Sequence, residues 1–324
     1  MGLTDSAREL FSKIEVLKDL ETIVRDLMDT HEKKRELWMP SDLVGPGPGD
    51  DPDEHRVALR QRAAGIPDHA RAALAVNLLT EEGLPHFHRL LAVYLGDDSF
   101  WRRWNNLWTA EEDRHGQVLH DYAREAMIFD QRKIEELQFE YLRAGFHPEW
   151  DRDPYRVFVY TSLQERATQQ SHAGVARVVA DFDPGLATVL DHCAKEEARH
   201  YTFYRQVFAE ILARDPDQAL HSASFVMPAI DMPGITIPGF KDLAEVIRRS
   251  GIYGPRDYLR IVEEQIRYWR IEALTGLNEM GRKAQEKICG IPDRLRRIAE
   301  YIETRSKAKT FSFEVVFNRE FAMP

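Results

Sequence analysis

The chain has 324 residues, of which 43% are apolar and 30% are charged, so its composition is neither that of a disordered chain nor that of a membrane protein. Asp and Glu outnumber Lys and Arg by 54 to 44, and the formal charge of -10 disfavours a nucleic-acid-binding protein, which needs a positive surface to displace phosphate counterions. No apolar stretch reaches the ~18 residues of a membrane span, and the two cysteines favour a reducing, cytoplasmic compartment.

Hydrophobic periodicity predicts helices along nearly the whole chain. A first helix is expected over residues 1–37, and a loop rich in Gly and Pro over 39–53. Turn and capping residues then divide the sequence into five long helices, at 68–95, 99–129, 130–145, 154–182 and 184–214. A weaker helix and a Pro-rich loop follow over 216–254, then two helices at 255–274 and 292–308, and only 311–317 alternates like a strand.

These elements predict an all-α helical bundle that forms one domain over residues 1–324. We expect an N-terminal helix and loop at about 1–66, a central bundle at about 67–214 and C-terminal helices at about 215–324. Pro85 lies four residues after Glu81, so its ring should clash with the Glu81 carbonyl and distort the helix there.

Two pentapeptides share one pattern. Glu-Glu-Asp-Arg-His occupies residues 111–115, and Glu-Glu-Ala-Arg-His occupies residues 196–200. Each contains Glu-x-x-His, and three residues along a helix turn about 300°, so the Glu and His side chains lie about 60° apart on one face. A single copy is common and carries little information. Two copies, both within apolar helices, predict a metal site.

A second regularity adds two carboxylates to these motifs. Glu81 precedes Glu112 by 31 residues, and Glu165 precedes Glu197 by 32. If each pair lies on a helical hairpin with its turn midway, the two carboxylates of a pair meet at the same height. Four helices then contribute four Glu and two His, which is the ligand set of ferritin-like di-iron and di-manganese proteins. The predicted ligands are Glu81, Glu112, His115, Glu165, Glu197 and His200.

An alternative interpretation places these residues on solvated faces, in helical salt bridges with Arg114 and Arg199. Apolar and aromatic residues at helical spacing flank the ligands, however, as Trp108 and Leu119 do around Glu112. Burying four unpaired carboxylates would be prohibitive, whereas two divalent cations would neutralise them. Carboxylate and imidazole ligands without a thiolate suit two iron ions, with manganese as the alternative.

Longer motifs around these residues resemble those of the soluble acyl-[acyl-carrier-protein] desaturases of the stearoyl-desaturase type. The resemblance extends from about Trp38 to the C-terminus. It is carried by Thr80-Glu81-Glu82-x-Leu84-Pro85, Trp108-Thr109-Ala110-Glu111-Glu112-x-Arg114-His115-Gly116, Tyr160-Thr161-Ser162-x-Gln164-Glu165-Arg166-Ala167-Thr168, Glu196-Glu197-x-Arg199-His200, Leu274-Thr275-Gly276-Leu277 and Cys289-Gly290-x-Pro292-x-Arg294-x-Arg296-Arg297.

The resemblance implies a role for each position. Glu112 and Glu197 would bridge both irons, with Glu81 and His115 completing one and Glu165 and His200 completing the other. Thr168 would place a hydroxyl beside the oxygen site, and Trp38 would lie on the electron route. Glu111 and Glu196, each directly before a bridging Glu, would support the ligands from behind; the family usually has Asp where this chain has Glu196.

The implied activity is oxygen-dependent insertion of a cis double bond into a saturated acyl chain bound to acyl carrier protein, in fatty acid biosynthesis. The implied partners are acyl carrier protein, a ferredoxin or similar electron donor, and a second copy of the chain in a homodimer. A ribonucleotide reductase small subunit is disfavoured because its radical Tyr would fall at Leu119. Ferritin-like iron storage fits poorly with 324 residues, and a desaturase-like protein without desaturase activity stays open.

Two further expectations concern the substrate. Tyr94 and Val157 stand where stearoyl-preferring relatives carry smaller residues, so the resemblance implies a shorter acyl pocket and a preference for palmitoyl or shorter chains. Residues 282–324 hold ten Lys/Arg and six Asp/Glu, a local charge of +4, which would suit an acidic carrier. Arg294, Arg296 and Arg297 are the candidate docking residues, with Arg56, Arg60 and Arg62 as competing basic candidates.

Overall fold

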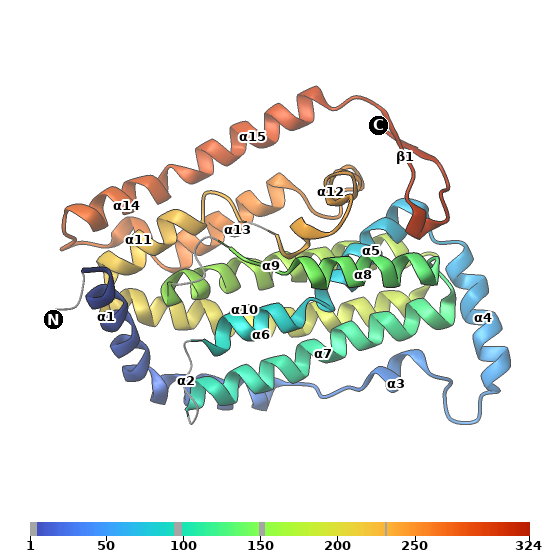
Figure 1. The fold of residues 1–324 in the computed structure, drawn as a ribbon, viewed down its shortest axis with the longest axis horizontal. Coiled ribbons are helices and arrows are strands. Elements are labelled where there is room, and N and C mark those ends of the chain that lie inside the picture. The colour runs from blue at the N-terminus through green and yellow to red at the C-terminus, as the bar shows by residue number, and fades with distance from the viewer. Residues whose placement is uncertain (1–4, 94–98, 149–152, 231) are drawn as a thin grey trace.

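Four long helices form the centre of the computed structural model, which describes residues 5–93, 99–148, 153–230 and 232–324. They are α5 (Asp68–Glu81), α7 (Phe100–Ala126), α9 (Pro154–Val179) and α10 (Pro184–Arg214). Helices α7, α9 and α10 run along the long axis of the molecule (Figure 1). Helix α5 packs on α7 and α9, and α10 packs on the same two helices, so the four close into a bundle.

Capping side chains fix where the long helices begin, as the sequence predicted. The Ser99 side chain accepts a hydrogen bond from the backbone N–H of Arg102 at the start of α7. The Asp183 carboxylate accepts from two backbone N–H groups in the first turn of α10. These side chains satisfy N–H groups that the helix itself leaves without acceptors.

Shorter elements cover the bundle. Helices α1 (Asp5–Asp19), α2 (Glu21–Lys34), α3 (Pro40–Val44) and α4 (Pro52–Ala64) precede it, and α6 (Leu84–Ala92) and α8 (Gln131–Ala144) connect its members. After α10 come α11 (Pro216–Val226), α12 (Phe240–Arg249), α13 (Pro255–Tyr268), α14 (Glu279–Cys289) and α15 (Ile291–Arg305), with 3-10 turns at Pro233–Thr236, Ile271–Ala273 and Glu314–Val316. Strands β1 (Lys309–Phe311) and β2 (Phe321–Met323) pair antiparallel near the C-terminus, with Phe311 opposite Phe321. The prediction of an all-α fold is confirmed; a single domain stays a prediction.

Several predicted boundaries are wrong. The described part of 1–37 contains two helices, α1 and α2, that meet at Leu20, and residues 39–53 contain α3 and the start of α4. The predicted helix over 68–95 ends at Glu81 and resumes at Leu84 as α6, which agrees with the clash expected from Pro85. Helix α14 was not predicted. Of the strand expected over 311–317, one residue, Phe311, lies in β1.

The apolar core has two parts on either side of a polar layer. One part contains Trp104, Trp108 and Tyr204, and the other contains Leu119 and Cys193. On α7 and α10 the polar side chains between these two parts belong to the two Glu-x-x-His motifs. Among the described residues, no helix combines the length and the apolarity that a membrane crossing requires.

Candidate metal centre

The structure brings all six predicted ligands together inside the four-helix bundle. Glu81 comes from α5, Glu165 from α9, and each of the Glu-x-x-His pairs from α7 or α10. His115, Glu165, Glu197 and His200 are fully buried, and Glu81 and Glu112 are 7% and 6% exposed. We call these residues the six-residue cluster: Glu81, Glu112, His115, Glu165, Glu197 and His200.

The cluster divides into two overlapping groups of four. Glu81, Glu112, His115 and Glu197 offer ligand atoms within 4.8 Å of one another, and so do Glu112, Glu165, Glu197 and His200. In the first group the Nδ1 atom of His115 lies 3.4 Å from Glu112 Oε2 and 3.3 Å from Glu197 Oε1. In the second, the Nδ1 atom of His200 lies 2.7 Å from Glu112 Oε1. Glu112 and Glu197 belong to both groups, which is the position a bridging carboxylate requires.

The chemistry of the cluster fits two divalent cations. Among the described residues, seven buried atoms find no partner with hydrogen-bond geometry, although His200 Nδ1 and Glu112 Oε1 approach to 2.7 Å: both oxygens of Glu165 and Glu197, Oε1 of Glu112, and Nδ1 of His115 and His200. Buried polar atoms in native proteins are rarely left without a partner. Because these seven are all potential metal-ligand atoms on one cluster, two cations would satisfy them and balance the charge of four carboxylates.

Protonation of the cluster reflects this crowding. Burial and the neighbouring Glu112 raise the pKa of Glu197 to about 7. Burial and the neighbouring Glu197 raise the pKa of Glu165 well above its ordinary value. For Glu81 burial acts in the same direction but is outweighed by the neighbouring imidazoles of His115 and His172, so the pKa of Glu81 falls below the ordinary value. The cluster therefore holds protons where cations would bind.

The two histidines are supported crosswise between the motifs. The Nε2 atom of His115 lies 3.1 Å from Glu196 Oε2, and the Nε2 atom of His200 lies 2.9 Å from Glu111 Oε2. Each supporting Glu directly precedes the bridging Glu of its own motif and reaches the His of the other motif. The side chain of Glu196 is long enough to reach the imidazole. This geometry turns both Nδ1 atoms toward the cluster.

Trp38 lies behind His115 and is 4% exposed. Its ring stacks on the His115 ring with centroids 6.1 Å apart and an interplanar angle of 2°. The Arg114 guanidinium lies over the Trp38 ring, donates to the Trp38 carbonyl at 2.6 Å and donates to Glu196 at 2.7 Å. A continuous set of contacts thus joins Trp38 to His115.

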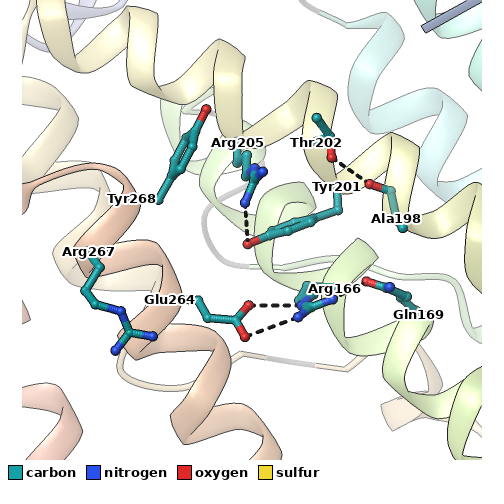
Figure 2. A pocket seen from close by; sticks show the side chains of 9 residues that line it. All are labelled: Arg166, Gln169, Ala198, Tyr201, Thr202, Arg205, Glu264, Arg267 and Tyr268. Carbon is teal, nitrogen blue, oxygen red and sulfur yellow. Dashed lines mark hydrogen bonds and ion pairs between the residues drawn. The ribbon is translucent and has the colours of Figure 1, made fainter. Parts of the chain in front are cut away.

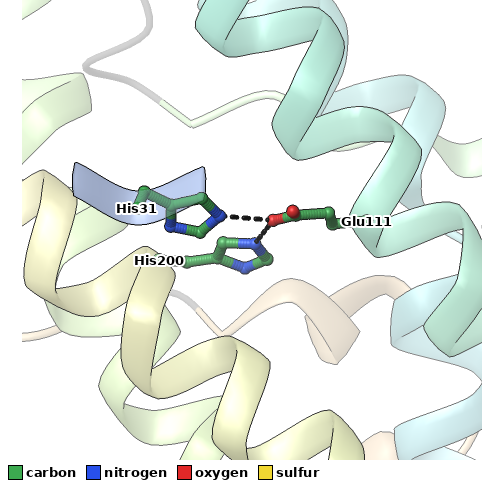
Figure 3. A group of neighbouring side chains, drawn as sticks. All are labelled: His31, Glu111 and His200. Atoms are coloured by element: carbon green, nitrogen blue, oxygen red, sulfur yellow. Dashed lines mark hydrogen bonds and ion pairs between the residues drawn. The ribbon is translucent and has the colours of Figure 1, made fainter. Parts of the chain in front are cut away.

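Sequence reasoning missed residues that complete the surroundings of the cluster. His172 Nε2 lies 2.8 Å from Glu81 Oε1, and Asn77 Nδ2 lies 3.2 Å from His172 Nδ1. His31 Nε2 lies 2.8 Å from Glu111 Oε2 (Figure 3). Both histidines carried a signal: His172 continues the apolar stripe that contains Glu165, and His31 follows the buried Val24 on α2.

Three separate cavities share lining residues from the surface to the cluster and beyond it. A pocket of about 540 Å³ opens between α5, α9, α12, α13 and α15, and Thr80, Thr168 and Pro233 line its inner part. The same three residues line a void of about 20 Å³ that reaches Glu81 and Glu112. A further void of about 10 Å³ follows, whose lining includes Phe87, Leu90, Trp108, Val157 and Tyr160. We call this series the apolar path.

The predicted pocket residues have different outcomes. Val157 lines the inner end of the apolar path and is 2% exposed, whereas Tyr94 lies outside the described residues. Thr168 lines the path beside Glu112, and its Oγ1 atom accepts a hydrogen bond from Gln164 Nε2 at 3.2 Å. Because the Thr168 oxygen accepts this bond, its own hydroxyl proton is free to point into the void.

The predicted docking arginines are exposed on α15, whose Leu295 and Ile298 line the outer pocket. Arg296 forms ion pairs with Asp293 and Glu263, whereas the described residues give Arg294 and Arg297 no ion pair. The competing basic residues are engaged elsewhere: Arg56 with Glu125 and Asp53, Arg60 with the carbonyl of Glu125, and Arg62 with Asp183.

A polar cleft of about 600 Å³ lies on another face of α10, between α9 and α13 (Figure 2). Arg166 forms two hydrogen bonds with Glu264, at 3.0 and 3.1 Å. Arg205 lies over the rings of Tyr201 and Tyr268, 4.7 and 4.3 Å from their centroids. These contacts fasten α13 to the bundle.

Comparison with known proteins gives consistent matches. The sequence model described as fatty acid desaturase matches residues 12–317. The chain is 36% identical over 326 residues to a stearoyl-[acyl-carrier-protein] 9-desaturase of Oryza sativa subsp. indica, covering 95% of this chain and 82% of the relative. It is 34% identical over 325 residues to that of Ricinus communis, with the same coverage. The structure of DesA2 from Mycobacterium tuberculosis H37Rv, assigned as an acyl-ACP desaturase, superposes with a TM-score of 0.60 at 19% identity and covers 83% of this chain and 99% of that chain.

Proposed function

Because this chain belongs to the fatty acid desaturase family, we propose that it inserts a cis double bond into a saturated acyl chain carried by acyl carrier protein. One observation carries the proposal: the cavities of the apolar path, which share lining residues, lie in series from an open pocket to the carboxylates of the six-residue cluster and beyond them. An acyl chain in this path would lie beside the cluster with its thioester end toward the surface.

The six-residue cluster would hold two iron ions, Glu112 and Glu197 between them, Glu81 and His115 on one and Glu165 and His200 on the other. Manganese is the alternative, since both ions accept carboxylate and imidazole ligands. When bound, the metal pair supplies the oxygen-derived oxidising power that removes hydrogen from an unactivated methylene.

The protein's own contribution is to orient the chain and to exclude water. Trp108 and Phe87 line both the void that reaches Glu112 and the inner void. Their rings confine an extended chain and keep the reacting carbons in apolar surroundings. The hydroxyl of Thr168 offers one proton donor at the same void, where oxygen would be reduced.

Electrons would reach the centre from the surface beside Trp38. The stacked rings of Trp38 and His115, with Arg114 and Glu196 joining them, support this route. A ferredoxin or a similar small donor protein would supply the electrons. We also propose a homodimer, as the resemblance implies, and a cytoplasmic location, which the two free cysteines support.

We propose a preference for palmitoyl or shorter chains. Val157 occupies the narrow inner end of the apolar path, where a longer chain would need further space. Two methylenes are worth about 1.6 kcal/mol at full burial, which corresponds to roughly tenfold discrimination.

The test is product analysis by gas chromatography. The purified protein, loaded with iron and supplied with oxygen and a ferredoxin reducing system, is given palmitoyl- and stearoyl-carrier protein in competition. Mono-unsaturated products, mainly from palmitoyl, are expected; absence of any unsaturated product contradicts the function. The Tyr94→Leu/Val157→Gly variant should shift the product ratio toward stearoyl. Val157→Ala is the control for the flexibility that Gly adds to α9. A product ratio that shifts in neither variant contradicts the chain-length proposal and leaves the proposed desaturase activity standing.

A further inference from the structure

We propose that His31 is a positioning residue for the metal ion on the His200 side of the centre, acting through Glu111. The proposal rests on the proposed metal centre and concerns α2, which contributes none of the six ligands. It predicts that the affinities of the two metal positions respond differently to mutation, because each position depends on a different set of residues behind its histidine.

Hydrogen bonding fixes the form of the His200 ring. Oε2 of Glu111 lies 2.8 Å from His31 Nε2 and 2.9 Å from His200 Nε2 (Figure 3). A carboxylate oxygen can only accept, so both Nε2 atoms carry the hydrogen in these bonds. Nδ1 is then the His200 ring atom that faces the cluster, 2.7 Å from Glu112 Oε1 and 3.7 Å from Glu165 Oε2, and a metal ion would take the place of the proton at this atom. This is the tautomer in which an imidazole binds a metal.

His31 holds Glu111 in place for that bond. The carboxylate has one further neighbour, Arg35, whose Nη1 lies 3.4 Å from Oε1 and whose side chain is 24% exposed. The His31 ring is 6% exposed, stacks on the His200 ring with centroids 5.7 Å apart, and meets the Trp104 ring edge-on at 5.1 Å. Its Nδ1 atom is buried and finds no hydrogen-bond partner in the part of the chain that the structure describes, so Nε2–H is the polar group that the ring uses.

The other half of the centre is supported differently. Glu196, behind His115, receives hydrogen bonds from Arg114 at 2.7 Å and Arg199 at 3.0 Å. Two guanidinium groups fix this carboxylate, and bonds from charged donors are the stronger ones. Neither group contacts Glu111 within 4.0 Å as an ion pair in the described residues. Removing His31 should therefore weaken one metal position and leave the other unchanged.

The experiment is a Co²⁺ titration of the metal-free full-length protein, followed by visible absorption and by calorimetry. The parent should bind two ions. His31→Phe keeps the ring volume and the stacking but loses the N–H donor, and it should bind one ion as the parent does and the other about 10- to 100-fold more weakly. His31→Gln keeps an N–H donor and should recover the second affinity to within about threefold of the parent. His88→Phe, which removes a half-buried His bonded to Thr109, is the matched control and should bind both ions normally.

The outcomes separate this proposal from the proposed function. A parent that binds fewer than two ions contradicts the metal centre itself. A parent that binds two, with His31→Phe indistinguishable from it, or with His31→Gln as weak as His31→Phe, overturns the role of His31. An equal loss of affinity for both ions in His31→Phe also overturns it, because that result indicates a general loss of packing. If His31→Phe does not fold by circular dichroism, His31→Met fills the same space with an adaptable apolar chain and gives the same comparison.

Discussion

Glu197 and Glu165 are acids whose surroundings oppose ionisation. Burial and the adjacent Glu112 raise the pKa of Glu197 to about 7, and burial and Glu197 raise the pKa of Glu165 well above its ordinary value. A metal ion binds the carboxylate and not the carboxylic acid, so cations and protons compete for these two residues. The metal-free cluster therefore retains protons on its carboxyl groups near neutral pH.

Metal affinity should therefore rise with pH. Below pH 7 the metal-free Glu197 carboxyl is protonated, and binding must expel that proton; above pH 7 this cost disappears for Glu197. We expect the affinity for Co²⁺ to increase by about tenfold per pH unit or more between pH 5.5 and 7, and less steeply above. Calorimetry in buffers of different ionisation enthalpy measures the protons released. An affinity independent of pH over this interval would contradict the protonated state of the metal-free cluster.

The shared position of Glu112 leads to a second prediction. Glu112 belongs to both groups of four, whereas Glu165 belongs to one. Glu112→Ala should lose both bound ions, and Glu165→Ala should retain one, as measured by metal analysis after gel filtration. Glu82→Ala, which removes a half-buried carboxylate bonded to Gln138, should retain both ions. Retention of both ions by Glu112→Ala would remove the bridge assignment.

At the scale of the element, helix starts and the clustering of the Glu and His side chains in one layer were predictable from the sequence, and the long-range contacts behind them were not. Ser99, Pro154 and Pro184 mark helix starts by local chemistry, and the spacing of Glu81 and Glu112 places ligands at equal height by helix geometry. The meeting of His31 with Glu111 joins positions 80 residues apart, which no local pattern encodes. The family resemblance drawn from the longer motifs is confirmed by the matches.

The interruption between α5 and α6 leads to an element-scale prediction. A Cβ atom at Gly83 would lie 2.5 Å from Tyr141 Oη and 2.8 Å from its Cε1. Gly83→Ala should displace the Tyr141 ring, break its 3.1 Å hydrogen bond to the Pro233 carbonyl, and destabilise the fold by about 1–3 kcal/mol. In the control variant Gly65→Ala, the added Cβ atom would lie 3.4 Å from its nearest neighbour, so the free energy of unfolding should change little. Urea unfolding of both variants is the measurement, and equal midpoints would contradict the close approach.

At the scale of the whole molecule, the apolar path opens beside a basic surface. Lys241, Arg248 and one acid, Glu245, line the outer pocket. Arg294 and Arg297 flank Leu295 and Ile298 on the same stretch of α15. The molecule has a net charge of -10, so positive side chains at this mouth differ in sign from the protein as a whole. An acidic carrier that delivers an acyl chain would be oriented by them.

Charge reversal at this mouth tests the docking assignment. Arg294→Glu/Arg297→Glu should weaken carrier binding by about tenfold or more at low salt and much less at 0.5 M salt, because surface charges are screened. Arg132→Glu, on the exposed face of α8, is the matched control and should bind the carrier as the parent does. Surface plasmon resonance at several salt concentrations measures both. Unchanged binding by the double variant would assign docking to another surface.

The crosswise support of the two histidines makes each half of the centre depend on both helical hairpins. Each helical hairpin supplies the carboxylate behind the other hairpin's imidazole, Glu111 for His200 and Glu196 for His115. Two identical hairpins related by a two-fold axis would generate the same scheme, since in such a pair every contact is made twice with the roles exchanged. One hairpin alone could build neither half. A change at one supporting Glu therefore acts first on the imidazole that the opposite hairpin contributes.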